Sequence, residues 1–138
     1  MEPSTRLRVV IAGPKLRQRA FRLRQGEKGL SLFGEATGVD AEMVIATLRR
    51  SGKRGPLAVA ELYADDIQRL GLVLVKTRVE TGNPLVDACH YEARLSEQQR
   101  ESLKSSSLDM IRYFNEEIAP RLCQLARPFR GPLNGGEI

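Results

Sequence analysis

Aromatic residues are scarce in this chain, which has no Trp, three Tyr and four Phe among 138 residues. Proteins that bind single-stranded nucleic acid stack bases on aromatic side chains, and many protein interfaces are anchored by Trp or Tyr. Long apolar runs are missing too: none approaches the roughly 20 residues that span a bilayer, and no secretory signal is visible at the N-terminus. We therefore expect a cytoplasmic protein that does not bind membranes.

Cysteine and histidine are also rare. The chain has two Cys, Cys89 and Cys123, and one His, His90. Without a CxxC spacing, neither a disulfide framework nor a structural zinc site is expected. Both thiols are predicted to be reduced and at least half-buried, since free Cys is among the most buried residue types. We expect no metal and no cofactor.

The length and the share of hydrophobic residues, 41%, are those of one globular domain with one core. We predict a single domain over residues 1–130 and a flexible C-terminal tail over residues 131–138.

Two stretches near the N-terminus alternate apolar and polar residues, as half-buried strands do. The first covers residues 5–12. In the second, residues 17–24, helix and strand are hard to separate, and we favour a strand. Residues 25–29 read as a tight turn leading to a short buried strand at residues 30–33, which together predict a hairpin.

The clearest helix signal lies at residues 41–50. Asp40 is suited to cap the first free N–H groups, and Val39 and Val44 occupy the positions of a hydrophobic staple. Cations and Gly52 end the helix.

The second half of the chain alternates strand and helix signals. Strands are predicted at residues 57–63, 72–79 and 86–94, and the Val-rich run at 72–79 indicates a strand covered on both faces. Residues 65–70 predict a short helical turn. A Ser/Gln capping box begins an apolar stripe over residues 96–120, which predicts a long helix of about six turns ending at the proline.

Together these signals predict an α+β fold. Five or six short strands form a mainly antiparallel sheet, with one mid-chain helix and a long C-terminal helix packed on the sheet.

Basic residues are concentrated at the N-terminus. Residues 1–28 hold eight Lys or Arg against two Glu, whereas the rest of the chain is nearly neutral. A basic patch suits an acidic protein or a phosphate backbone, although arginines can also simply keep an exposed strand soluble. Residues 53–56 form a basic loop that would extend the patch if the fold brings them together. The predicted partner-binding residues are Arg17, Arg19, Arg22, Arg24, Lys28, Arg49, Arg50, Lys53 and Arg54.

Catalytic candidates are few. On a strand, His90 and Glu92 share one face about 7 Å apart, where the imidazole could act as a general base. The alternative is an ionic row outside the sheet. The order Arg24, Ser31, Glu92 resembles the order of Arg, Ser and Glu in the active sites of ADP-ribosyltransferases. The sequence is also compatible with an RNase-like site. The spacing Gly26-x-x-Gly29 fits neither a P-loop nor a dinucleotide fingerprint.

Residues 24–33, followed by His90-Tyr91-Glu92, resemble small uncharacterised bacterial proteins with an R-x-G-E-x-G-L-S-x-F opening and a late H-x-E. The resemblance covers about residues 21–95. It implies an accessory component, toxin or defence associated, of a bacterial conflict or mobile-element system.

The sequence therefore predicts a small non-enzymatic protein that binds an acidic protein or a nucleic acid through its Arg-rich N-terminal sheet region. The alternative is an enzyme acting on a nucleotide or nucleic acid, ADP-ribosyltransferase-like or RNase-like, that uses His90, Glu92 and Ser31 with Arg22 and Arg24.

Overall fold

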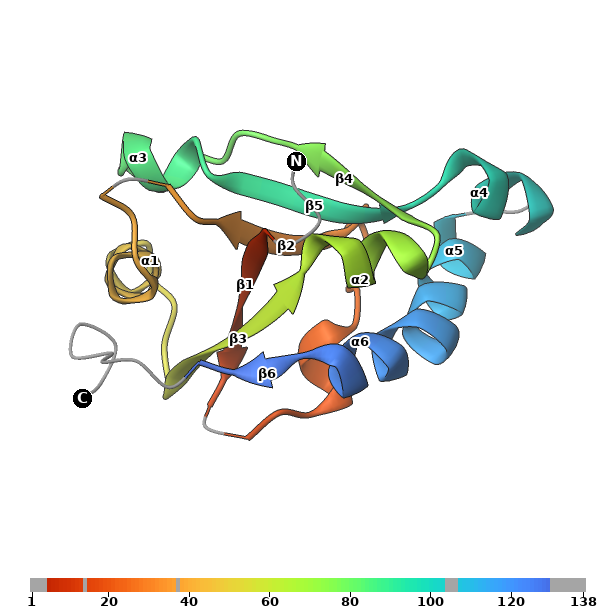
Figure 1. Ribbon diagram of the computed structural model, residues 1–138, viewed down its shortest axis with the longest axis horizontal. Coiled ribbons are helices and arrows are strands. Elements are labelled where there is room, and N and C mark those ends of the chain that lie inside the picture. Colours follow the sequence, from red (N-terminus) through yellow and green to blue (C-terminus); the bar gives the residue numbers. More distant parts are fainter. Residues whose placement is uncertain (1–4, 14, 37, 104–106, 130–138) are drawn as a thin grey trace.

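A computed structural model describes residues 5–13, 15–36, 38–103 and 107–129. They form one six-stranded antiparallel sheet with helices on both faces (Figure 1), so the predicted single α+β domain is confirmed. The predicted tail at residues 131–138 lies outside the described residues. No helix in the described part is both long and apolar enough to cross a membrane.

The sheet has the strand order β4-β5-β2-β1-β3-β6. Each pair of neighbouring strands is antiparallel, and the long β1–β3 pair runs from Arg6↔Tyr63 to Ala12↔Leu57. The strand bounds are β1 (Arg6–Ala12), β2 (Leu30–Gly34), β3 (Leu57–Tyr63), β4 (Leu72–Lys76), β5 (His90–Leu95) and β6 (Arg127–Pro128).

The main core lies on the sheet face to which Leu7, Val9 and Ile11 point. This face is covered by the 3₁₀ turn η1 (Gln18–Phe21), by α2 (Ala64–Arg69) and by the C-terminal helical run. That run consists of α5 (Ser107–Tyr113), the π-helical turn η2 (Phe114–Ile118) and α6 (Ala119–Leu125). The long C-terminal helix therefore packs on the sheet as predicted, with Phe114 and Leu122 fully buried.

The C-terminal helical run does not end at Pro120 as predicted. The π turn lets the N–H of Ala119 donate to the carbonyl of Phe114 five residues earlier, and Pro120 then falls in the first turn of α6. Proline is tolerated there because an N–H at a helix start has no intrahelical partner. The predicted cap of α4 (Glu97–Leu103) is confirmed: Ser96 and Gln99 exchange hydrogen bonds of 2.8 and 3.1 Å.

The opposite face of the sheet carries α1 (Ala41–Arg50) and the short α3 (Pro84–Asp87). Asp40 accepts from the N–H of Met43 at 2.8 Å, and Val39 and Val44 are buried in one cluster, which confirms the predicted cap and staple.

The strand predicted from Val86 begins only at His90, because residues 84–87 are helical. Asn83 caps this helix by accepting from the N–H groups of Leu85 and Val86, and Pro84 opens it. Asp87 accepts from the hydroxyl and the N–H of Thr81, and the hydroxyl is the main reason that its pKa is lowered.

Two further strand predictions are wrong. Residues 17–24 form η1 and an extended segment instead of a strand, so no hairpin with β2 exists. Phe21 and Leu23 are both buried without strand pairing, and their spacing produced the misleading alternation. The Val-rich strand β4 is an edge strand that ends at Lys76, and Val73 is 42% exposed, so it is not covered on both faces. Cys89 and Cys123 are free thiols, buried and half-buried as predicted.

Candidate functional site

A cleft opens where strands β1 and β2 part. The two strands pair only at Leu7↔Gly34 and Arg8↔Phe33. The same register would place Val9 opposite Leu32 and then Val10 opposite Ser31, but neither pair forms. Figure 1 shows β1 (red) running steeply away from β2 (orange). The resulting cavity of about 750 Å³ is lined on its strand sides by Val9, Val10, Ile11, Leu30 and Ser31. We call it the β1–β2 cleft.

One wall of the cleft is the segment of residues 15–24, which we call the strap. Its residues Ala20 and Leu23 line the cleft. Asn115, in the π turn of the C-terminal helix, accepts from the N–H of Leu23 at 2.6 Å and donates to its carbonyl at 3.0 Å. Both main-chain groups of one strap residue are thus held by one side-chain amide, which fixes the strap against the core.

The turn between the strap and β2 depends on two glycines. Gly26 has φ +88°, which favours glycine, and Glu27 caps the turn by accepting from the N–H of Arg24 at 2.5 Å. At Gly29 a Cβ would lie 2.6 Å from the carbonyl oxygen of Ala93 on β5. The Gly26-x-x-Gly29 spacing therefore has a structural cause: one glycine makes the turn and the other lets β2 approach β5.

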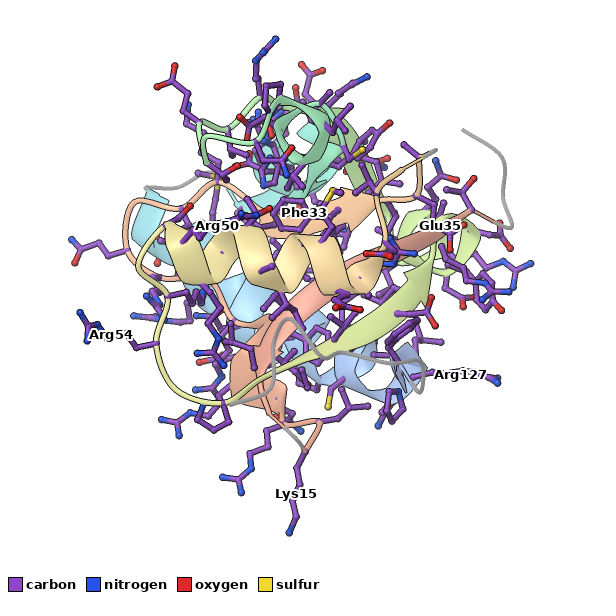
Figure 2. All side chains as sticks on the ribbon, turned by 90° about the vertical axis from the view of Figure 1, so that its left-hand side faces the viewer. Lys15, Phe33, Glu35, Arg50, Arg54 and Arg127 are labelled. Carbon is purple, nitrogen blue, oxygen red and sulfur yellow. The ribbon has the colours of Figure 1, made fainter. Side chains whose placement is uncertain are left out.

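Seven cations among the described residues surround the cleft. All are exposed, and their side chains form no ion pair or hydrogen bond with another described residue. Among the described residues that line the cleft, Glu27 is the single carboxylate. Figure 2 shows Lys15 and Arg54 extending outward from the body of the domain. The seven are Lys15, Arg17, Arg19, Arg22 and Arg24 of the strap and Lys53 and Arg54 of the loop after α1.

The fold thus joins six of the nine predicted partner-binding residues in one place, including the basic loop. Lys28 lines a different cavity, with Arg94 and Arg100. Arg49 donates to the carbonyl of Gly55, and neither it nor Arg50 lines the cleft. Lys15 was missing from the predicted set, although its place in the basic N-terminal stretch was a usable signal.

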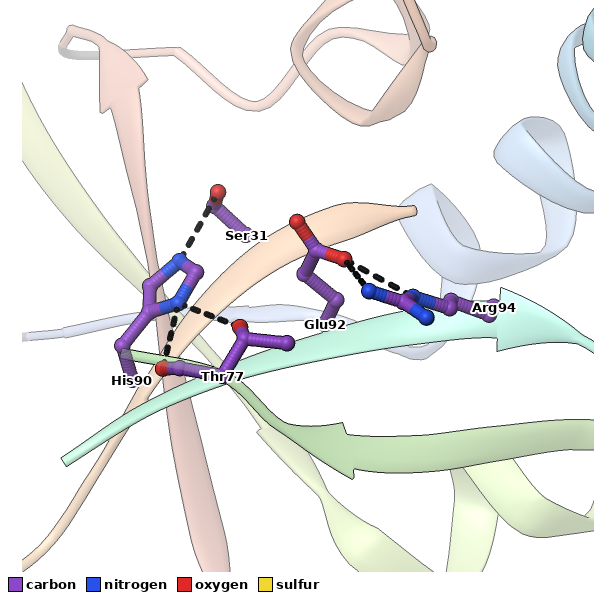
Figure 3. A network of polar contacts seen from close by, with 5 residues as sticks. All are labelled: Ser31, Thr77, His90, Glu92 and Arg94. Carbon is purple, nitrogen blue, oxygen red and sulfur yellow. Dashed lines mark hydrogen bonds and ion pairs between the residues drawn. The ribbon is translucent and has the colours of Figure 1, made fainter. Parts of the chain in front are cut away.

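His90 is buried beside the cleft, and Ser31 links the two. The Nε2 atom of His90 lies 3.0 Å from Ser31 Oγ, and its Nδ1 atom lies 2.8 Å from Thr77 Oγ1 and 3.1 Å from the Thr77 carbonyl oxygen (Figure 3). The ring also packs edge-on against Phe33, with centroids 5.2 Å apart. Two neighbouring segments, strand β2 and the residue after β4, therefore fix the imidazole.

Burial lowers the pKa of His90 below its ordinary value of 6.5, and the Thr77 carbonyl, Glu92 and Asp87 offset this only in part. The imidazole is thus neutral at pH 7. In the tautomer that the Thr77 carbonyl favours, Nδ1 carries the proton and the Nε2 lone pair accepts from the Ser31 hydroxyl. A hydroxyl that donates to a fixed neutral imidazole is the arrangement of an activated nucleophile.

Glu92 does not join this pair. Its Oε1 atom accepts from Arg94 Nε at 2.8 Å and lies 2.6 Å from Arg94 Nη2 (Figure 3). Glu92 stands opposite Ser31 in the β2–β5 register, yet it does not line the cleft, whereas Arg24 and Ser31 do. Of the residues placed in an ADP-ribosyltransferase-like order, two therefore share the cleft and the third is engaged in an ion pair on the sheet.

The described residues contain no group of three or more His, Cys, Asp or Glu that could hold a metal ion. Fold and site together define an α+β domain with a six-stranded sheet and a basic cleft between two diverging strands. Comparison of the chain with protein-family models, with curated proteins and with solved structures finds no match.

Proposed function

We propose that this protein is a non-enzymatic binding protein of the bacterial cytoplasm that holds an anionic macromolecular partner in the β1–β2 cleft. The observation that carries the proposal is the set of seven exposed cations around one cavity, none paired with a described residue. Like charges held together repel one another, and an anionic partner relieves this repulsion while forming charge-assisted hydrogen bonds. A role in a conflict or mobile-element system belongs to the same proposal and rests on the motif of residues 24–33.

The test is a pair of double charge reversals. Arg22→Glu with Arg24→Glu alters the cleft, and Arg112→Glu with Arg121→Glu makes the same change of net charge on exposed positions of the C-terminal helical run. Binding to polyglutamate and to a single-stranded oligonucleotide is measured by fluorescence anisotropy. The cleft variant should bind the preferred polyanion about tenfold more weakly or worse, and the helix variant nearly as well as the wild type. Equal losses in both variants would reject the cleft as the site.

A second function is favoured by one specific observation, the 3.0 Å contact between His90 and Ser31 at the wall of the basic cleft. In this alternative, the protein is an enzyme that binds the phosphates of a nucleotide or nucleic acid through Arg22 and Arg24. His90 would then act as the base that withdraws the Ser31 proton.

Incubation with labelled RNA and with NAD⁺, followed by chromatography, tests the enzyme. Turnover that disappears in Ser31→Ala and in His90→Gln, with the circular dichroism spectrum preserved, would establish it. Wild-type protein that turns over neither compound would dismiss it.

A further inference from the structure

The β1–β2 cleft exposes main-chain hydrogen-bonding groups as well as cations. In an antiparallel sheet, successive residues direct their N–H and C=O groups to alternate neighbouring strands. The N–H of Gly34 donates to the carbonyl of Cys89, the residue before β5. The main-chain groups of Ser31 and Phe33 therefore point the other way, toward β1. The N–H of Gly13 donates to the carbonyl of Pro56, the residue before β3. The main-chain groups of Arg8 and Val10 therefore point toward β2.

Arg8 and Phe33 are register partners, whereas Val10 and Ser31 come after the point where pairing stops. The main-chain N–H and C=O groups of Val10 and Ser31 consequently point into the cleft, one residue from each strand wall. Unpaired strand edges are templates for another extended chain. The cleft therefore combines a partial sheet edge with a basic rim.

The nature of these groups selects the class of partner. A phosphate backbone offers only acceptors to them, and it leaves the carbonyls of Val10 and Ser31 without donors. The described residues that line the cleft include no aromatic side chain on which bases could stack. A peptide main chain supplies donors and acceptors alternately and satisfies both kinds of group. The cleft is therefore better suited to a peptide than to a nucleic acid.

The walls also select the side chains of such a peptide. In an extended chain, successive side chains point to opposite faces. The cleft offers the apolar residues Ala20, Leu23 and Leu30 together with exposed cations, of which Arg22 and Arg24 flank Leu23 directly. Alternating apolar and acidic residues match this arrangement.

We infer that the β1–β2 cleft binds an extended acidic peptide segment by β-strand addition, with main-chain hydrogen bonds to Val10 and Ser31 and carboxylates on the strap arginines. The inference rests on the proposed binding function, because it needs the cleft to be the binding site. It adds the chemical class of the partner and the geometry of its binding.

The probe is a capped peptide of about ten alternating Glu and Val residues. Two derivatives carry N-methyl groups on every second residue, one on the Glu set and one on the Val set, which removes main-chain donors without changing the charge. Calorimetry at about 150 mM salt measures affinity, and hydrogen exchange measured by NMR follows the amides of Val10 and Ser31. At least one derivative should bind about tenfold more weakly than the parent, and one or both amides should exchange more slowly in the complex.

The result separates this inference from the function on which it rests. If both derivatives bind as tightly as the parent and neither amide is protected, the inference is overturned, even where Arg22→Glu with Arg24→Glu abolishes binding and so supports the cleft as the site. If an oligothymidine displaces the peptide and binds more tightly, the partner is nucleic acid and the inference is again overturned. If the charge reversal leaves peptide binding intact, the proposed function fails as well.

Discussion

The hydroxyl of Ser31 lies 3.0 Å from Nε2 of His90, across two neighbouring strands. The side chain of Ser31 is thus held by the imidazole, while its main chain faces the β1–β2 cleft. His90 is itself fixed by Thr77 and Phe33. The β2 wall of the cleft is therefore rigid before any partner arrives, which lowers the entropy cost of binding.

The stability of the protein should depend on pH through His90. Burial lowers the pKa of His90 in the folded protein below the ordinary value of 6.5. At pH values between these two pKa values, His90 is protonated in the unfolded chain and neutral in the folded protein. Unfolding free energy should therefore fall as pH drops below about 6.5. In His90→Gln this slope should flatten. Urea unfolding at about pH 7.5, 6.5 and 5.5 measures it, and an unchanged slope in the variant would assign the titration to another group.

The two glycines of the turn should respond differently to substitution. At Gly26 nothing lies within 4 Å of an added Cβ, so Gly26→Ala should cost only the left-handed conformation, about 1 to 2 kcal/mol. Gly26→Asn should recover part of this, because Asn tolerates positive φ.

Gly29→Ala forces a Cβ to 2.6 Å from the carbonyl oxygen of Ala93 and should cost about 1 to 3 kcal/mol through displacement of β2 from β5. Gly29→Asn should give no recovery. Chemical denaturation of the four variants measures this pattern, and recovery by Asn at Gly29 would show that conformation and not space is limiting there.

Asn115 should control both stability and the cleft. Asn115→Ala leaves the N–H and C=O of Leu23 without their partner, at a cost of about 1 to 3 kcal/mol. The strap should then move more, so hydrogen exchange at Arg22 to Arg24 should accelerate beyond the global change. Asn115→Asp keeps the acceptor and loses the donor, so its stability and strap exchange should lie between those of the wild type and of Asn115→Ala. Exchange that rises equally throughout the protein would mean that Asn115 has no special hold on the strap.

The cation cluster should be a source of instability in the absence of a partner. Arg22→Gln with Arg24→Gln removes two of the seven like charges and should leave the melting temperature unchanged or raise it slightly, because neither side chain has a described partner to lose. Added salt should raise the melting temperature of the wild type more than that of the variant. Calorimetric scans at low and high salt test this. A variant that melts clearly below the wild type would show that these arginines stabilise the fold.

Local signals in the sequence were sufficient for much of the fold. Asp40 and Ser96 each cap a helix through a hydrogen bond within three residues, so the pattern contains its own explanation. The strap could not be predicted in this way. Phe21 and Leu23 are buried by contacts with the core, including Phe114 from the far end of the chain, and local alternation does not distinguish this from a strand.

The site was predictable in its charges but not in its geometry. The run of basic residues marked most of the cations, yet Arg49 and Lys28 fall away from the cleft because their direction depends on the packing of α1 and of the turn. The parting of β1 from β2 has no local signature, since it depends on which strands pair. The contact of Ser31 with His90 spans 59 residues and likewise follows only from the register of β2 and β5.

The amide of Asn115 forms hydrogen bonds only with main-chain atoms of the strap, so these bonds do not depend on which side chains stand beside Leu23. Arg22 and Arg24 point to solvent on either side of this anchor point, so they can be exchanged for other residues without loosening it. Main-chain atoms thus hold the strap in place, whereas the side chains of Arg22 and Arg24 contact the proposed ligand. Such a division allows a lineage, or an engineer, to retarget the cleft one side chain at a time while the scaffold stays the same.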